Sequence, residues 1–291
     1  MSQLSAFKTF ARQTFLYSLY RKFRGPIPTE AAAQKKLQQF TESGFKQIRD
    51  KNIEFWIRIN PNNGFVDQEI YLNGLYEPQI CKILRKHVHA ESVCLDVGAN
   101  IGHHCLFMAQ VAKKGKVYAF EPIPELAHQL HDSIKKNGLQ NIEVCNFGLS
   151  NVNEKKAAYI DKQNMGRTTF HDRKEETVVQ DLEVRVFDDY WNFRSRIDFV
   201  KMDVEGYEYY ALQGMAKAIA HYHPVLLLEF TPLFYSKMDF DSAEILQLIF
   251  DLGYKIFDIE RKGKEVRRAN LTAFIEETPV QTNLLCLPLK R

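Results

Sequence analysis

The chain has 291 residues, of which 45% are hydrophobic, enough for one large core with appendages or for two small domains. Its 39 basic and 36 acidic residues leave a formal net charge of +3, which gives no general case for nucleic-acid binding. The five cysteines form no CxxC pair, and no stretch approaches the ~20 apolar residues of a membrane span. These features favour a reduced, cytoplasmic compartment.

The first 30 residues contain no acid before Glu30, and their apolar residues can share one helical face between basic ones. We expect an accessory helix that packs on the rest of the chain. Two alternatives stay open: peripheral membrane contact through residues 1–24, and a mitochondrial-type transit peptide. "RGPIPTE" is predicted to end this helix, and "EAAAQKKLQQFTESGF" predicts a second helix that stops near Gly44.

The next segment changes character. Residues 53–72 have strand-like and turn-like pieces around "NPNNG", and "YEPQICKILRKHV" predicts a helix with Pro78 in its first turn. We divide the chain into a largely helical N-terminal extension, residues 1–90, and a catalytic domain, residues 91–291.

From Glu91 onward, predicted strands and helices alternate. Apolar runs predict strands at Val93–Val97, Lys116–Phe120, Ile142–Asn146, Ile197–Met202 and Val225–Phe230. Helices are predicted to begin near Gly102, Pro124, Glu208 and Ser242. A hairpin-like insertion is expected at about residues 157–187, and "YKIFDI" with "NLLCLPL" is expected to close the sheet as an antiparallel pair. This order predicts a doubly wound, Rossmann-like α/β domain.

The glycine turn after the first of these strands is the first place to expect a cofactor, and it contains Asp96, Gly98, Ala99, Asn100 and Gly102. A dinucleotide site needs G-x-G-x-x-G, and Asn100 replaces its middle glycine, which disfavours a NAD-dependent oxidoreductase. S-adenosylmethionine (SAM) fits better. Asp96 suits its cationic portion, Gly98 permits close backbone approach, and a helix N-terminus near Gly102 favours its carboxylate. A helix-capping role for Asp96 is the alternative.

Four further acidic positions lie at or just after the ends of predicted strands. Glu121, before Pro122, ends the second strand and can accept both ribose hydroxyls of NAD or SAM. Asp203 ends the fourth strand and is expected to face the reacting part of the cofactor, with Lys201 on the same side of the strand. Glu205 is expected either to cap the next helix or to line the acceptor pocket. Glu229, near the end of "VLLLEF", is a further carboxylate at this edge.

Together, "LDVGANIGHH", "VYAFEPIPELAHQLHDSIKKNGLQNIEVCNFGLSN" and "IDFVKMDVEGYEYYALQGM" resemble the FkbM family of SAM-dependent methyltransferases. "YLNGLYEP", "HPVLLLEF" and "LGYKIFDI" extend the resemblance over about residues 71–258. It implies a class I methyltransferase fold, a doubly wound seven-stranded sheet whose last strand is antiparallel, with SAM held by Asp96 to Gly102, Glu121 and Asp203. The better-known members methylate hydroxyls of secondary metabolites or glycans. His103 and His104 depart from the family's common pattern, and residues 1–70 have no clear match.

The predicted reaction is O-methylation of a hydroxyl on a glycan or small-molecule acceptor. The candidate bases are Asp203, Glu205, His103 and His104. N-methylation and methylation of another small molecule stay as alternatives, although "DVEG" stands where N-P-P-[FY] would indicate an amide or nucleobase acceptor. We favour a metal-independent reaction over one with a divalent cation at Asp203, Glu205 and Glu229. The sequence specifies neither the acceptor nor the oligomeric state.

Overall fold

The structure is a computed structural model that describes residues 36–161, 164–165, 168, 170, 177–236 and 238–289. The chain divides into two compact units, Met1–Thr41 and Glu42–Arg291. The predicted N-terminal helix and most of the second lie outside the described residues, so both stay predictions. The predicted end of the second helix near Gly44 is wrong, because the described helical residues stop at Leu37 and a turn follows. None of the helices in the described part of the chain combines the length and apolar character needed to span a bilayer.

The unit Glu42–Arg291 begins with an antiparallel hairpin of β1 (Gly44–Asp50) and β2 (Ile53–Ile59), followed by α3 (Phe65–Asn73) and α4 (Pro78–His87). Pro78 opens α4 as predicted. The expectation of strand and turn through residue 72 is wrong from Phe65 onward. There Asp67 and Ile70, one helical turn apart, are both buried and define the inner face of α3.

The central sheet has the strand order β12-β11-β13-β10-β9-β3-β4-β5. The bounds are β3 (Val93–Val97), β4 (Lys116–Phe120), β5 (Ile142–Cys145), β9 (Phe199–Met202), β10 (Val225–Phe230), β11 (Tyr254–Asp258), β12 (Lys264–Val266) and β13 (Thr282–Pro288). β13 inserts antiparallel between β10 and β11, as the class I methyltransferase fold requires. The three-residue strand β12 adds an eighth strand to the seven that were predicted.

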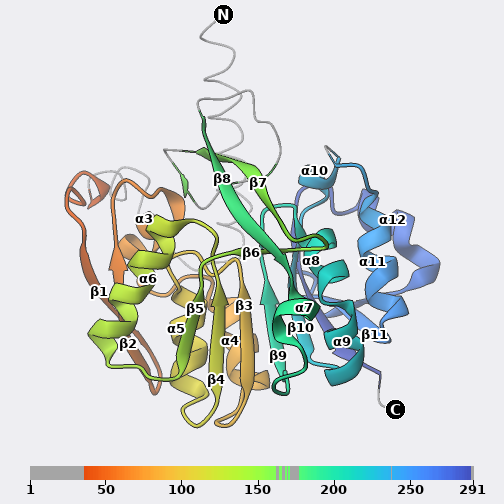
Figure 1. Cartoon of the computed structure of the whole chain (residues 1–291), viewed down its shortest axis with the longest axis horizontal. Helices are drawn as coiled ribbons and strands as arrows, with labels where there is room; N and C mark the ends of the chain where they lie inside the picture. Colours follow the sequence, from red (N-terminus) through yellow and green to blue (C-terminus); the bar gives the residue numbers. More distant parts are fainter. Residues whose placement is uncertain are drawn as a thin grey trace, which may run out of the picture. The chain divides into compact units, whose positions relative to one another are not determined.

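Helices cover both faces of this sheet (Figure 1). They are α5 (His103–Val111), α6 (Pro124–Asn137), α7 (Phe187–Trp191), α8 (Glu208–Gly214), α9 (Ala216–Tyr222), α10 (Pro232–Tyr235), α11 (Ser242–Asp251) and α12 (Leu271–Glu276). The chain moves from β3 toward β5 through α5 and α6, and from β9 to β10 in the opposite direction through α8 and α9. Because such crossovers are right-handed, these two helix pairs lie on opposite faces.

The predicted insertion is confirmed as the antiparallel pair β7 (Glu154–Asp161) and β8 (Thr177–Val186). It begins slightly earlier than expected and is joined by β6 (Gly148–Ser150), which pairs in parallel with β8. The insertion is therefore a separate three-stranded sheet beside the central one (Figure 1).

Candidate active site

The candidate site lies where parallel strands end. The glycine turn follows β3, Glu121 follows β4, Asp203 follows β9, and Glu229 lies near the end of β10. β3 pairs in parallel with β4 on one side and with β9 on the other. From β3 the strand order proceeds to β4 and β5 in one direction, and to β9 and β10 in the other. In doubly wound sheets this reversal point is where ligands bind. The topology therefore gathers the acidic residues that the sequence spaced more than 20 positions apart.

The glycine turn packs closely against the end of β9. Gly98 has φ +78°, and a Cβ there would lie 1.9 Å from the carbonyl oxygen of Asp203. The amides of Gly98 and Ala99 both donate to the Phe120 carbonyl, at 3.0 Å. Asn100 adopts φ +52°, a conformation that asparagine tolerates, and its Oδ1 accepts from the Ile101 amide at 2.7 Å. Only glycine fits at position 98, whereas asparagine serves at position 100.

Glu121 holds the turn in place. One carboxylate oxygen accepts from the Asn100 amide at 2.8 Å and the other from the Ile123 amide at 2.9 Å. Only 4% of the residue is exposed. Burial raises the pKa of Glu121 to about 7, against the lowering effect of these two amides. Each carboxylate oxygen still has a second lone pair, so the group can accept ligand hydroxyls while it supports the turn.

Asp96, Lys201 and Asp203 form a charge triplet beneath the turn. The Lys201 Nζ lies 3.7 Å from Asp96 and 3.2 Å from Asp203. Burial opposes the charge on Lys201, but Asp203, Asp96 and Glu77 outweigh it and raise the lysine pKa. Burial also raises the pKa of Asp96 to about 6, although Lys201 lowers it. When both acids are ionised, the triplet keeps one net negative charge.

These residues fit SAM. The Asp96 carboxylate is fully buried beside the turn, with the Lys201 Nζ 3.7 Å away. Such a group retains acceptor capacity for a cation. Gly98 lets the turn pack against the end of β9 with no Cβ between them. The negative triplet suits a ligand that carries ammonium and sulfonium charges. The cofactor roles of Asp96, Gly98, Ala99, Asn100, Gly102, Glu121, Pro122 and Asp203 stay predictions.

A narrow slot begins beside Asp203 and continues across the end of β10. Its walls include Asp203, Lys201, Glu229, Asn283 and Glu77. Glu229 accepts from Gln281 Nε2 at 2.7 Å and from Thr231 Oγ1 at 3.3 Å. Burial raises the pKa of Glu229 well above its usual range, and nearby carboxylates raise it further. The slot is therefore acidic and adjoins the turn through Asp203.

Two carboxylates of this region escaped the sequence analysis. Glu77 precedes α4 in the left-handed conformation, φ +43°, and faces the slot. Glu208 is fully buried, and its Oε1 accepts from the amides of Val204 and Gly206 at 3.0 and 3.3 Å. Glu208 thus holds the loop after β9, where Glu205 had been considered as the cap. Glu77 does not follow a predicted strand, so no sequence pattern placed it at the sheet edge. Its position before Pro78 indicated only a turn.

The two consecutive histidines lie at the start of α5 and are nearly fully buried. His103 Nε2 accepts from the Tyr76 amide at 3.2 Å. His104 Nε2 lies 3.7 Å from Glu77 Oε2, and burial holds the pKa of His104 well below its usual range. Neither histidine lines the slot. The catalytic roles predicted for His103 and Glu205 have no direct support in this placement and stay predictions.

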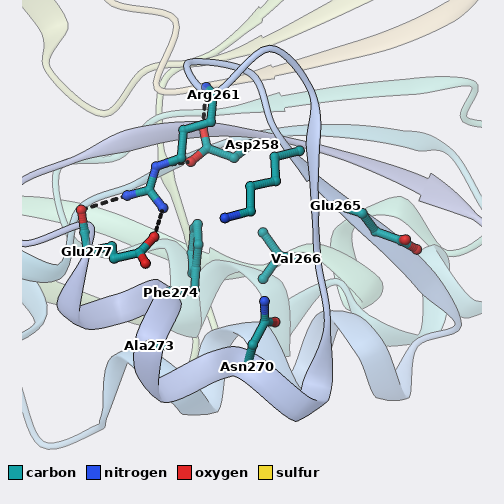
Figure 2. Close-up of a pocket in the computed structure, with 9 residues that line it drawn as sticks. Asp258, Arg261, Glu265, Val266, Asn270, Ala273, Phe274 and Glu277 are labelled. Carbon is teal, nitrogen blue, oxygen red and sulfur yellow. Dashed lines mark hydrogen bonds and ion pairs between the residues drawn. The ribbon is translucent and has the colours of Figure 1, made fainter.

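A second hollow lies beyond the sheet edge, between β12 and α12 (Figure 2). Three of its five charged lining residues bind one another. Arg261 Nη1 donates to Glu277 at 2.7 Å, and its Nε lies 3.3 Å from Asp258. Phe274 forms part of its wall. Because Arg261 is already paired with Asp258 and Glu277, the hollow offers no cradle comparable to the glycine turn.

Comparison with known proteins supports one family. The methyltransferase FkbM domain model matches residues 96–256, more than half of the chain. The chain is 33% identical over 88 residues to the AMB antimetabolite synthetase AmbE of Pseudomonas aeruginosa, covering 30% of this chain and 4% of that protein. It is 41% identical over 66 residues to protein-L-isoaspartate O-methyltransferase 2 of Archaeoglobus fulgidus, covering 22% of this chain and 30% of that protein.

Among solved structures, an FkbM methyltransferase from Methylobacillus flagellatus aligns with 88% of this chain and 58% of its own, at 17% identity and a TM-score of 0.44. The chain thus spans less than two thirds of each of these relatives. The match runs from Asp96, near the end of β3, to Ile256 in β11, and it includes the turn, Glu121, Asp203 and Glu229. The chain belongs to the FkbM family of SAM-dependent methyltransferases.

Proposed function

We propose that the chain transfers the methyl group of SAM to the oxygen of a hydroxyl on a small-molecule or glycan acceptor. The observation that carries this proposal is the partly buried carboxylate of Glu229 in the wall of the slot beside Asp203. When bound, SAM supplies an electrophilic methyl group, so the protein must align an acceptor and remove its proton. A neutral hydroxyl is a poor nucleophile and needs a base more than a neutral amine does.

We assign the base to Glu229, in place of the Asp203, Glu205 and His103 expected from sequence. A carboxylate whose pKa is raised by burial and by like charges is a stronger base once it is ionised. Gln281 and Thr231 each donate to one of its oxygens and fix its orientation. Asp203 is held by Lys201, and we place it with the cofactor.

The proton balance is simple. The hydroxyl proton moves to the Glu229 carboxylate while the acceptor oxygen takes the methyl group, and Glu229 later returns the proton to solvent. This route uses no divalent cation at Asp203, Glu205 or Glu229. One relative matched over 66 residues is named an O-methyltransferase, which agrees with oxygen as the acceptor atom.

The test pairs Glu229→Gln with Glu260→Gln. Glu260, after β11, accepts from Asn283 at 3.2 Å and does not line the slot. A panel of hydroxylated acceptors is screened for S-adenosylhomocysteine (SAH) release, and the methylated atom is located by NMR. We expect an O-methyl product. The kcat of Glu229→Gln should fall by at least about 100-fold, and that of Glu260→Gln should be nearly unchanged.

SAH affinity should stay within about twofold in both variants, because neither removes a group assigned to the cofactor. An N-methyl product from the wild type would contradict the proposed acceptor class. Full kcat in Glu229→Gln would remove Glu229 as the base.

A further inference from the structure

A cluster of metal-ligand side chains lies behind the acidic slot. Cys81 comes from α4, and His103 and His104 open α5. One ligand atom from each residue lies within 4.8 Å of the other two, and all three residues are buried. A thiol and two imidazoles converge on one point from two helices, where packing alone would favour apolar side chains.

The surroundings of the cluster favour a ligand over simple packing. His104 Nε2 is buried and makes no hydrogen bond to a described residue. A buried polar nitrogen in that state carries a desolvation penalty that a metal bond would offset.

A fourth ligand is within reach. Glu77 Oε2 lies 3.7 Å from His104 Nε2, close enough for this carboxylate oxygen and the imidazole to share one metal ion. The rings of Phe55 and Tyr76 pack edge-on against His103, at 5.6 and 5.9 Å between centroids. The cluster therefore has the sulfur, nitrogen and oxygen donors and the dry surroundings typical of zinc sites.

We infer that Cys81, His103 and His104 bind one transition-metal ion of the zinc class, with Glu77 as the fourth ligand. Zn²⁺ takes four such ligands at about 2.0–2.3 Å in a tetrahedron, which places ligand atoms about 3.3–3.8 Å apart. The three atoms, at up to 4.8 Å, need side-chain adjustments of about 1 Å to reach that spacing.

Metal binding would replace two hydrogen bonds that Cys81 and His103 make with the Tyr76 backbone. Cys81 Sγ now donates to the Tyr76 carbonyl at 3.4 Å, and His103 Nε2 accepts from the Tyr76 amide at 3.2 Å. A thiolate has no proton to donate. If the His103 imidazole binds the metal through Nδ1, its proton lies on Nε2; if it binds through Nε2, the metal occupies that nitrogen. In both cases Nε2 can no longer accept the hydrogen bond from the Tyr76 amide. The Cys81 proton leaves to solvent as the metal–sulfur bond forms.

The metal would join α4 to the first turn of α5, directly after the glycine turn, and would fix Glu77 at the wall of the slot. It would stabilise the cofactor region without touching the reacting atoms. The inference does not depend on which acceptor atom is methylated, and its test requires no turnover.

The test uses untagged, full-length protein that has been stripped with a chelator, dialysed and titrated with Co²⁺ as a spectroscopic probe of zinc sites. We expect one equivalent to bind, with a thiolate-to-cobalt charge-transfer band and the intense visible bands of tetrahedral Co²⁺. Excess Zn²⁺ should abolish both bands. Zn²⁺ should also raise the thermal midpoint of the wild type, because the metal binds the folded state.

Cys81→Ala is the decisive variant, and Cys286→Ala is its matched control, since Cys286 is equally buried but lies outside the cluster. Cys81→Ala should lose the charge-transfer band and bind metal about 100-fold more weakly or worse, whereas Cys286→Ala should behave as the wild type. Absence of one-equivalent binding by the wild type, or the same band in Cys81→Ala, would overturn the inference.

Zinc-edge X-ray absorption on the wild type tests the same point without any variant, should Cys81→Ala fail to fold. One sulfur and two or three nitrogen or oxygen neighbours are expected. A ligand shell without sulfur would overturn the assignment.

Discussion

At the scale of single residues, the tightest constraint is the approach of Gly98 to the end of β9. We expect Gly98→Ala to lose about 2–5 kcal/mol of unfolding free energy, because it adds left-handed strain and a clash with the Asp203 carbonyl. Gly138→Ala is the control. It has φ +63° with nothing within 4 Å of its added Cβ, so only about 1–2 kcal/mol should be lost. Urea unfolding measures both, and equal losses would contradict the packing described for the turn.

Asp67 gives a second prediction at this scale. It is buried in α3, and its Oδ1 accepts from the Asn60 amide at 2.7 Å and from Gln129 at 2.9 Å. Burial raises its pKa from 3.8 to about 7, so ionisation is disfavoured in the folded state. Its stabilising contribution is therefore complete below about pH 4 and is lost as pH rises through 7.

Asp67→Asn keeps the accepting oxygen and removes the charge. Thermal melts at pH 5 and pH 8 should show a smaller loss of stability on going to pH 8 in Asp67→Asn than in the wild type. Asp96, Glu121, Glu208 and Glu229 also have raised pKa values, but they are present in both proteins, so the difference isolates Asp67. Identical pH profiles would show that Asp67 does not titrate as described.

At the scale of elements, the β1–β2 hairpin is joined to α6 by side chains that bind its backbone. The Asn137 amide group donates to the Trp56 carbonyl at 2.6 Å and accepts from the Trp56 amide at 2.7 Å. Ser133 accepts from the Arg58 amide at 2.9 Å. These side chains satisfy one edge of β2 in place of a further strand, which explains why a two-stranded hairpin is stable here.

We therefore expect Asn137→Ala to lose about 2–4 kcal/mol of unfolding free energy, because it leaves two partly buried backbone groups without partners. Lys135→Ala, on the exposed side of the same helix, should change stability by about 0.5 kcal/mol or less. Chemical denaturation compares the two variants. Similar losses would show that the hairpin is held mainly by apolar contacts.

At the scale of the whole molecule, all candidate site residues lie in Glu42–Arg291. Deletion of residues 1–24 should therefore leave SAH affinity within about twofold of the full chain. Calorimetric titration of both proteins measures this, and liposome binding tests the membrane alternative for the same segment. A large loss of SAH affinity would mean that the N-terminal segment contributes to the cofactor site.

Much of this fold was predictable because its strands are buried on both faces. β3, β4 and β10 match their predicted bounds to the residue, since each is a short apolar run between turns. The acids at strand ends were found for the same reason. Glu77, Glu208 and the Cys81 cluster were not, because they depend on a left-handed backbone or on contacts between helices that no local pattern encodes. β12 is too short to carry a periodic signal.

The central claim is that the glycine turn and Glu121 hold SAM. Its most direct test is calorimetric titration of the wild type, Glu121→Gln and Glu121→Ala with SAH at pH 8, beside thermal melts of each protein. Charge-assisted hydrogen bonds from the ribose hydroxyls contribute about 1.5–3 kcal/mol each, so Glu121→Ala should bind at least about tenfold more weakly, with Glu121→Gln in between. Unchanged affinity in a folded Glu121→Ala protein, or binding of NAD without SAH by the wild type, would contradict the account.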